Sequence, residues 1–324
     1  MRFLGLLIII SLISVCLSGQ DFSKISLDNL GIKGKVKTYI ELSYNINEGD
    51  DPEEVIKEKP DTYEETHFNK KGYIEFSNHY RNGDLEGKSV YTYDKKGGLT
   101  SVAAFGPDGS EMGVMITQTF DKKGNLLERN MPFSGGKETW SYNGKGNKVD
   151  YTIYRNGEPR MTHKYEYDDS GYNTTEMWVR ADGTIDYEFQ YVYDDRGNML
   201  EKNGMFNDEL NDRWVFKYDE DGNKIEEGHA GGDAVVYARF VYSFDDNRNV
   251  ISKEEYGKNG ELVRKESFTY DMQGNMTEEM EKANQYSRTF KYEFQYDQQG
   301  NWTSRYVINE QGITHIKLRE FIYY

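Results

Sequence analysis

One short motif recurs along this chain at a nearly constant spacing. It consists of an aromatic residue followed by Asp or Asn, with Gly four positions after the aromatic in nine of ten copies. Successive copies are 22 to 27 residues apart. Their aromatic residues are Phe68, Tyr93, Phe120, Tyr142, Tyr167, Tyr193, Tyr218, Phe244, Tyr270 and Tyr296. A period of this length indicates a tandem array of one small supersecondary unit.

Each unit has the pattern of a β-hairpin. Aromatic and polar residues alternate before the motif, as in Trp214-Val215-Phe216-Lys217-Tyr218, and period two is typical of a half-buried strand. The motif Asp accepts bonds from backbone N–H groups two residues on, and the Gly supplies the positive φ that closes the turn. Asn-Gly and Asp-Gly pairs halfway through the unit predict a second turn, as at Asn156-Gly157. We therefore expect an all-β protein of about 20 strands, folded into a long, curved or coiled antiparallel sheet.

The composition agrees with a single sheet that has little deep core. Only 36% of the 324 residues are hydrophobic, which is low for two conventional domains, whereas 15% are aromatic, which excludes a disordered chain. The net charge of −16 disfavours nucleic acid and anionic membrane surfaces as partners.

The N-terminus has the features of a secretory signal. Arg2 precedes an apolar run that is too short to span a bilayer, and small residues follow. We predict a signal peptide over residues 1–19, an N-terminal capping strand and acidic loop over 20–66, and the repeat array over 67–324. Cleavage after Gly19 leaves Gln20 first. Alternatively, Ile13-Ser14-Val15-Cys16 is similar to a bacterial lipobox, in which Cys16 is lipidated. Either outcome places the protein outside the cytoplasm, as a secreted, periplasmic or outer-membrane-anchored bacterial protein.

The motif resembles the YD repeats of the RHS family over residues 67–301. The resemblance implies a strip of β-hairpins that spirals into a shell or an extended curved sheet. Large members enclose a toxin or take part in adhesion and contact-dependent competition. This chain ends at Tyr324, directly after the last repeat, so the toxin role is not implied. It resembles small secreted repeat proteins of the Bacteroidota.

No motif indicates catalysis, a cofactor or a metal. A calcium loop needs about six oxygen ligands, whereas lysine pairs such as Lys70-Lys71 occupy the middle of several turns. The five histidines lack metal-ligand spacing. We expect a protein that is not an enzyme.

Two tryptophans are the candidate ligand-binding residues. Trp140 and Trp214 align with strand aromatics, which favours packing within the sheet, whereas Trp178 and Trp302 follow a turn. The hypothesis is a binding or scaffold module of the cell envelope whose partner is an unknown protein or glycan. It contacts a membrane only through a lipid anchor at Cys16. The alternative is a carbohydrate-binding or toxin-associated RHS-type protein of contact-dependent competition.

Overall fold

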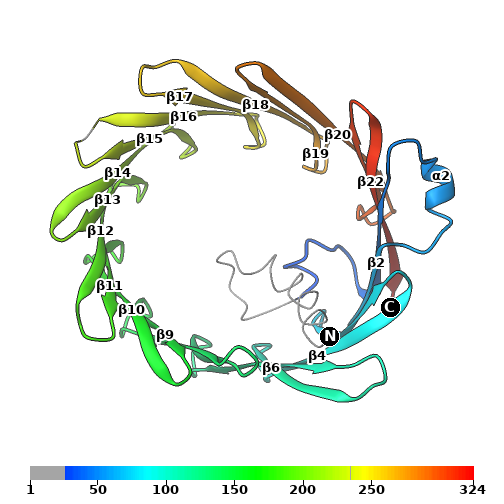
Figure 1. Cartoon of the computed structure of the whole chain (residues 1–324). Coiled ribbons are helices and arrows are strands. Elements are labelled where there is room, and N and C mark those ends of the chain that lie inside the picture. Colours follow the sequence, from blue (N-terminus) through cyan, green and yellow to red (C-terminus); the bar gives the residue numbers. More distant parts are fainter. Residues whose placement is uncertain (1–25, 234) are drawn as a thin grey trace. The chain divides into compact units, whose positions relative to one another are not determined.

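The computed structural model describes residues 26–233 and 235–324 and consists almost entirely of antiparallel strands (Figure 1). The signal peptide and Cys16 lie outside the described residues. The chain forms two compact units, one of residues 1–136 and 292–324 and the other of residues 137–291. We call them unit 1 and unit 2.

Unit 1 contains nine strands and one short helix. Their bounds are β1 Val36–Asn45, α2 Pro52–Val55, β2 Thr62–Phe68, β3 Ile74–Arg81, β4 Asp84–Tyr93, β5 Leu99–Phe105, β6 Glu111–Phe120, β7 Leu126–Met131, β21 Trp302–Asn309 and β22 Gly312–Tyr323. The loop predicted to be acidic thus contains one turn of helix, which begins where the Asp51 carboxylate accepts a hydrogen bond from the backbone N–H of Glu53 at 2.9 Å.

Unit 2 is built from strands alone, and the boundaries of the units pass through β8 and β20. The bounds are β8 Gly136–Tyr142, β9 Lys148–Arg155, β10 Glu158–Tyr167, β11 Asn173–Arg180, β12 Ile185–Tyr193, β13 Met199–Phe206, β14 Glu209–Tyr218, β15 Lys224–Gly231, β16 Val236–Phe244, β17 Val250–Gly257, β18 Leu262–Tyr270, β19 Met276–Ala283 and β20 Tyr286–Tyr296.

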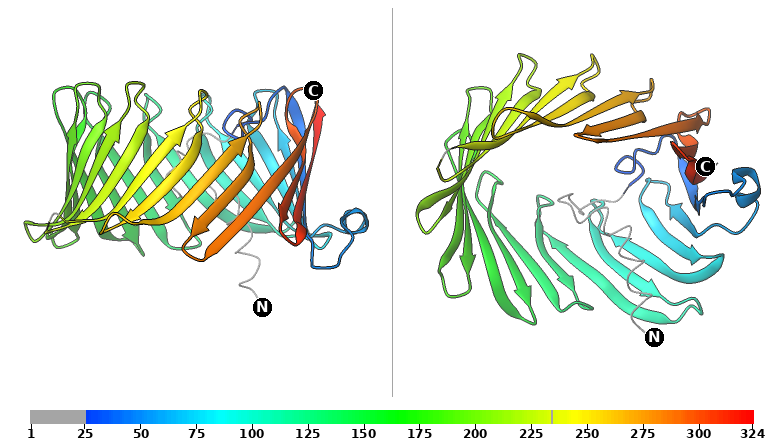
Figure 2. Two further views of the ribbon diagram at one scale, coloured as in Figure 1. Left: turned by 90° about the horizontal axis from the view of Figure 1, so that it is seen from above. Right: turned by 45° about the horizontal axis from the view of Figure 1, so that its top comes forward.

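The expectation of a long, curved or coiled sheet is wrong, because its first and last strands pair with each other, although the all-β class is confirmed. All 22 strands belong to one hydrogen-bonded sheet. Within unit 1, β1 pairs with β2 on one side and with β22 on the other. The blue and red ends of the described chain accordingly lie side by side in Figures 1 and 2. This pairing leaves neither terminal strand as an unpaired edge.

The turns after the motif aromatics have one recurring geometry, which confirms the predicted turn chemistry. In the turn of Asp94, the side chain accepts hydrogen bonds from the backbone N–H groups of Lys96 and Gly98, both at 2.8 Å, and Gly97 has a φ of +85°. Where Asn follows the Gly, its side-chain amide can also bind the Asp, as Asn223 does to Asp219 at 2.9 Å. The side chains of the two middle residues take no part in this turn, which leaves their identity free.

The buried hydrophobic clusters lie in unit 1. The first joins Leu27 and Ile32 of the N-terminal segment to Val36, Phe68 and Ile74 of the sheet. The second consists of Tyr44, Ile46 and Ile316, with Val55 of α2 packed against it. In unit 2, Phe189 and Ala230 are the only buried hydrophobic residues among those described. Unit 2 is therefore held mainly by strand pairing and by half-buried side chains on the sheet faces.

Candidate binding surface

A continuous row of aromatic and histidine rings crosses unit 2 at right angles to its strands. Its eight members are Trp140, Tyr151, His163, Trp178, Phe189, Trp214, His229 and Phe240, which come from β8, β9, β10, β11, β12, β14, β15 and β16. The centroids of consecutive rings lie 5.1 to 6.3 Å apart. We call this set the aromatic row. With strands spaced about 4.8 Å apart, its contour is roughly 40 Å.

β13 contributes no ring to the row but supplies a lysine. Gly204 of β13 pairs directly with Phe189, and its lack of a side chain makes room for Tyr187, whose hydroxyl would lie 2.4 Å from an added Cβ. The ammonium group of Lys202 lies 4.0 Å from the ring centroid of Phe189 and 5.0 Å from that of Trp214. These are cation–π distances, so the row remains continuous across β13.

Glu176 fixes the polar edges of the rings around Trp178. Its carboxylate accepts hydrogen bonds from the indole N–H of Trp178 at 2.8 Å and from the hydroxyl of Tyr191 at 3.1 Å, and it binds Nδ1 of His163 at 2.9 Å. Burial opposes the ionisation of Glu176, but the three hydrogen bonds outweigh it and lower its pKa to about 2. Glu176 is therefore ionised at neutral pH and holds Trp178 and His163 in defined orientations.

A second carboxylate repeats this arrangement further along the row. Glu227 of β15 binds Nε2 of His229 at 2.6 Å and also pairs with Lys224. Burial again opposes ionisation, but the bonds from Lys224 and His229 lower the pKa of Glu227. At the other end, Tyr151 donates to Glu138 at 2.6 Å. The row thus combines ring faces with fixed carboxylate acceptors, which suits a ligand that carries both apolar faces and hydroxyl groups.

The structure places Trp178 inside the aromatic row, together with Trp140 and Trp214. All four tryptophans of the chain are half-buried, so exposure does not separate Trp178 and Trp302 from the two that the sequence assigned to packing. Sequence reasoning missed the row itself, because the period-two aromatics mark strands but do not give the register between them. Ring pairs across strands depend on that register.

Trp302 lies in unit 1, and a cation covers its ring. The guanidinium carbon of Arg319 lies 3.3 Å from the centroid of the Trp302 ring, and the Phe294 ring meets Trp302 edge-on at 6.2 Å. Arg319 is in turn held by Glu41, whose carboxylate accepts from Nε at 2.9 Å. Trp302 is therefore a poorer stacking platform than Trp178.

Glu41 and Glu64 form an acid pair on adjacent strands that sequence reasoning also missed. Burial opposes the ionisation of Glu41, but Lys317 and Arg319 outweigh it and lower its pKa to about 2. Burial is the chief cause that raises the pKa of Glu64 to about 7, although the Thr66 hydroxyl donates a hydrogen bond to its carboxyl group at 3.0 Å.

Among the described residues, no group of three or more His, Cys, Asp and Glu side chains has an arrangement that could hold a metal ion. None of the helices in this part of the chain has the length and apolar character needed to cross a membrane.

Comparison with known proteins gives only weak structural likenesses. No protein-family model matches the chain, and no curated protein matches it. The Tc holotoxin pore of Photorhabdus luminescens is similar over 78% of this chain and 17% of its own, with 12% identity and a TM-score of 0.42. A TcdB2–TccC3 structure without the hypervariable C-terminal region is similar over 81% and 17%, with 11% identity and a TM-score of 0.41.

A third likeness is to a porin-like protein from Bacteroides uniformis. It covers 88% of this chain and 98% of that one, with 11% identity and a TM-score of 0.29. The chain spans only 17% of the length of the two toxin chains. Likenesses this weak carry no functional argument.

Proposed function

We propose that this protein is a non-enzymatic binding protein of the bacterial envelope, secreted or lipid-anchored, which binds a linear glycan along the aromatic row. The observation that carries the proposal is the continuity of the row. Eight rings from eight strands follow one another at 5.1 to 6.3 Å, and seven of them are only half-buried. A row of ring faces matches the repeated apolar faces of a sugar chain.

The charges along the row favour a neutral glycan. Glu138, Glu176 and Glu227 place carboxylate oxygens beside the rings, where they accept hydrogen bonds from sugar hydroxyls and repel acidic sugars. Lys148, Lys202 and Lys253 lie over the rings of Tyr151, Phe189 and Phe240, so the row carries charges of both signs. The leader sequence supports the location outside the cytoplasm.

Glycan-array binding followed by calorimetry tests the proposal. The array carries neutral and acidic oligosaccharides, and the neutral oligosaccharide retained best is then titrated. We expect Trp178→Ala and Trp214→Ala each to weaken its binding at least tenfold, since an aromatic stacking contact is worth about 1–3 kcal/mol in comparable sites. Trp302→Ala is the matched control, because Arg319 already covers that ring, and it should leave the affinity unchanged.

Folding must be separated from binding, because Trp178 is part of a packed cluster. Trp178→Phe keeps an aromatic face and loses the bond to Glu176, and it should retain most of the affinity if stacking dominates. The bound oligosaccharide should be recovered intact after prolonged incubation. The proposal is wrong if no glycan is retained, if folded Trp178→Ala and Trp214→Ala bind normally, or if shortened products appear.

A further inference from the structure

Three neighbouring turns of unit 1 carry a lysine at every middle position. The turns span residues 69–72, 94–97 and 121–124. The six side chains, which we call the lysine rim, are Lys70, Lys71, Lys95, Lys96, Lys122 and Lys123, and all are exposed. The turns are adjacent in space, since the ammonium group of Lys96 donates to the backbone carbonyl of Lys122 and the rings of Tyr73 and Tyr93 stack at 5.0 Å.

The turn geometry does not require these lysines. The same two positions hold Glu220 and Asp221 in one turn of unit 2, and Met272 and Gln273 in another, with the same backbone hydrogen bonds. Only two turn aspartates, Asp94 and Asp121, lie within the three lysine turns, because the first turn begins with an Asn. The lysine rim is therefore a local positive surface on a chain whose net charge is −16.

Five of the six lysines of the rim are not neutralised by ion pairs with described residues. Among the described residues, Lys70, Lys71, Lys95, Lys96 and Lys122 make no ion pair. The repulsion between these ammonium groups is reduced only by water and salt. An external anionic surface would therefore gain from contact with these five lysines.

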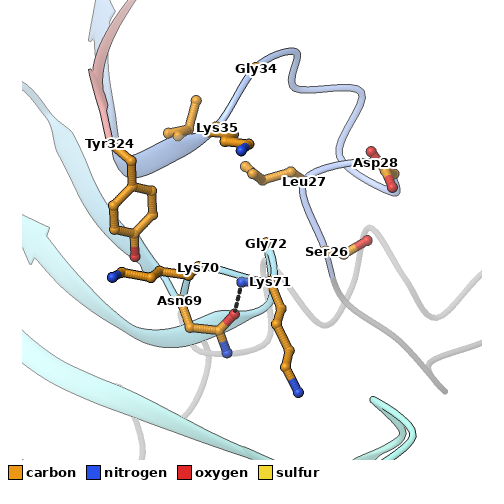
Figure 3. Close-up of a pocket in the computed structure, with 11 residues that line it drawn as sticks. Ser26, Leu27, Asp28, Gly34, Lys35, Asn69, Lys70, Lys71, Gly72 and Tyr324 are labelled. Atoms are coloured by element: carbon orange, nitrogen blue, oxygen red, sulfur yellow. Dashed lines mark hydrogen bonds between the residues drawn. The ribbon is translucent and has the colours of Figure 1, made fainter.

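The N-terminal segment reaches the sheet at this same rim. The backbone N–H of Leu27 donates to the carbonyl of Gly72 at 3.0 Å, and Ser26 forms a β-bridge with Tyr73. Figure 3 shows the segment from Ser26 to Lys35 and the turn that contains Lys70 and Lys71 on two sides of one pocket. Lys33 and Lys35 of that segment are also exposed. In Figure 2 (left), the segment lies at the same end of the strands as the C-terminus.

Chain length then limits how far this rim lies from a lipid at Cys16. Ten residue steps separate Cys16 from Ser26, and they span at most about 35 Å when fully extended. Basic side chains close to a membrane surface are attracted to anionic lipid headgroups, and each Lys or Arg adds to the attraction. A lipid anchor and a basic patch also strengthen one another, because each keeps the other near the surface.

We propose that the lysine rim docks on an anionic lipid surface, with the strands of unit 1 pointing away from the membrane. The net charge of the whole chain disfavours anionic membranes as partners, but this expectation does not hold at the lysine rim. The average hides a rim whose charge is opposite to that of the whole chain. The proposal shares the leader assignment with the proposed function, but it does not depend on glycan binding.

The test uses the secreted chain without its leader, residues 20–324, so that no lipid contributes. Vesicles of phosphatidylcholine, with and without phosphatidylglycerol, are sedimented with the protein at low and at physiological salt. We expect binding only with phosphatidylglycerol, and weaker binding at the higher salt. The rim variant carries Lys→Gln at the six positions of the lysine rim and should bind at least tenfold more weakly.

A charge-matched control separates the rim from the net charge. It carries Lys→Gln at six exposed lysines elsewhere, namely Lys57, Lys59, Lys164, Lys217, Lys258 and Lys282. The control loses the same charge and should bind phosphatidylglycerol vesicles within twofold of the parent chain. Equal loss of binding in both variants would show a net-charge effect and overturn the proposal.

Orientation is read from single dye-labelled cysteines, since Cys16 is the only cysteine of the chain and is absent from residues 20–324. A polarity-sensitive dye at Lys123→Cys should shift to the blue on vesicles, whereas one at Asp108→Cys, in the turn at the other end of β5, should not. Binding of a soluble acidic polysaccharide or of RNA in preference to the vesicles would assign the rim to another partner. That result, or a blue shift at Asp108→Cys alone, contradicts the proposal. Glycan binding by the same rim variant should be unchanged, so the two proposals fail separately.

Discussion

Glu41 and Glu64 are directly paired across β1 and β2, yet their carboxyl groups have opposite pKa shifts. Lys317, at 2.6 Å, and Arg319 neutralise Glu41, so its pKa falls to about 2 despite burial. Glu64 accepts a hydrogen bond from Thr66, but burial, together with the charge of Glu41, outweighs this bond and the charge of Lys317 and raises its pKa to about 7. One cationic pair thus decides which of two adjacent acids is ionised.

Glu64 should make unit 1 less stable as the pH rises. Its pKa is higher in the folded chain than in the unfolded chain, so its stabilising contribution is complete below about pH 4.5 and is lost as the pH rises to about 7. Glu64→Gln should raise the free energy of unfolding at pH 8 by at most about 3 kcal/mol, and should change it little at pH 4. Urea unfolding at both pH values measures this. The exposed Glu75→Gln on β3 is the control and should show no such pH dependence; equal effects would contradict the assignment.

Glu176 should have the opposite pH dependence in unit 2. Its pKa of about 2 is lower than in the unfolded chain, so its contribution is present above about pH 4.5 and is lost as the pH falls toward 2. Glu176→Gln should lower the free energy of unfolding at pH 7 by about 1–3 kcal/mol, since charge-assisted bonds to His163 and Trp178 are lost. It should also change tryptophan fluorescence. Glu166 on neighbouring β10 is exposed, so Glu166→Gln should change neither the free energy of unfolding nor the fluorescence. If Glu176→Gln also changed neither quantity, the role of Glu176 would be refuted.

The pairing of β1 with β22 is tested by two isoleucines of the same strand. Ile316 is fully buried against Tyr44 and Ile46, whereas Ile322 is 51% exposed. Ile316→Ala should lower the free energy of unfolding by about 2–5 kcal/mol, and Ile322→Ala by less than about 0.5 kcal/mol. Denaturant titration followed by circular dichroism gives both values. Similar losses at the two sites would mean that β22 does not pack on β1 in this register.

Two turn glycines separate backbone strain from steric contact. Gly124 has a φ of +95° and open space around an added Cβ, whereas at Gly97, with a φ of +85°, that atom would lie 2.1 Å from the hydroxyl of Tyr73. Gly124→Ala should lower the free energy of unfolding by about 1–2 kcal/mol through backbone strain alone. Gly97→Ala should lower the free energy of unfolding clearly more, because the Tyr73 ring must also leave its stacked position on Tyr93. Adding Tyr73→Ala to Gly97→Ala should remove the excess, and failure to do so would contradict the contact.

Much of the local structure follows from the sequence. The motif residues specify the turn, since Asp94 and Gly97 need only their own neighbours to close it. The alternating aromatics, such as Trp214, Phe216 and Tyr218, specify strands on either side. The row that joins Trp178 to Phe189 and Trp214 is not specified in the same way, because it depends on the register of the four strands β11 to β14. The stacking of Arg319 on Trp302 likewise depends on packing between side chains that no sequence period relates.

The sequence by itself determined an all-β chain of repeated hairpins, because turn and strand preferences act over a few residues. Only the tertiary structure decided whether that sheet has ends. Pairing of β1 with β22 brings together residues almost 280 positions apart, such as Glu41 and Arg319, and no local preference encodes such a contact. The pairing gives each of two edge strands a partner. For the same reason the acid pair, the aromatic row and the lysine rim became visible only after the strands had been placed beside one another.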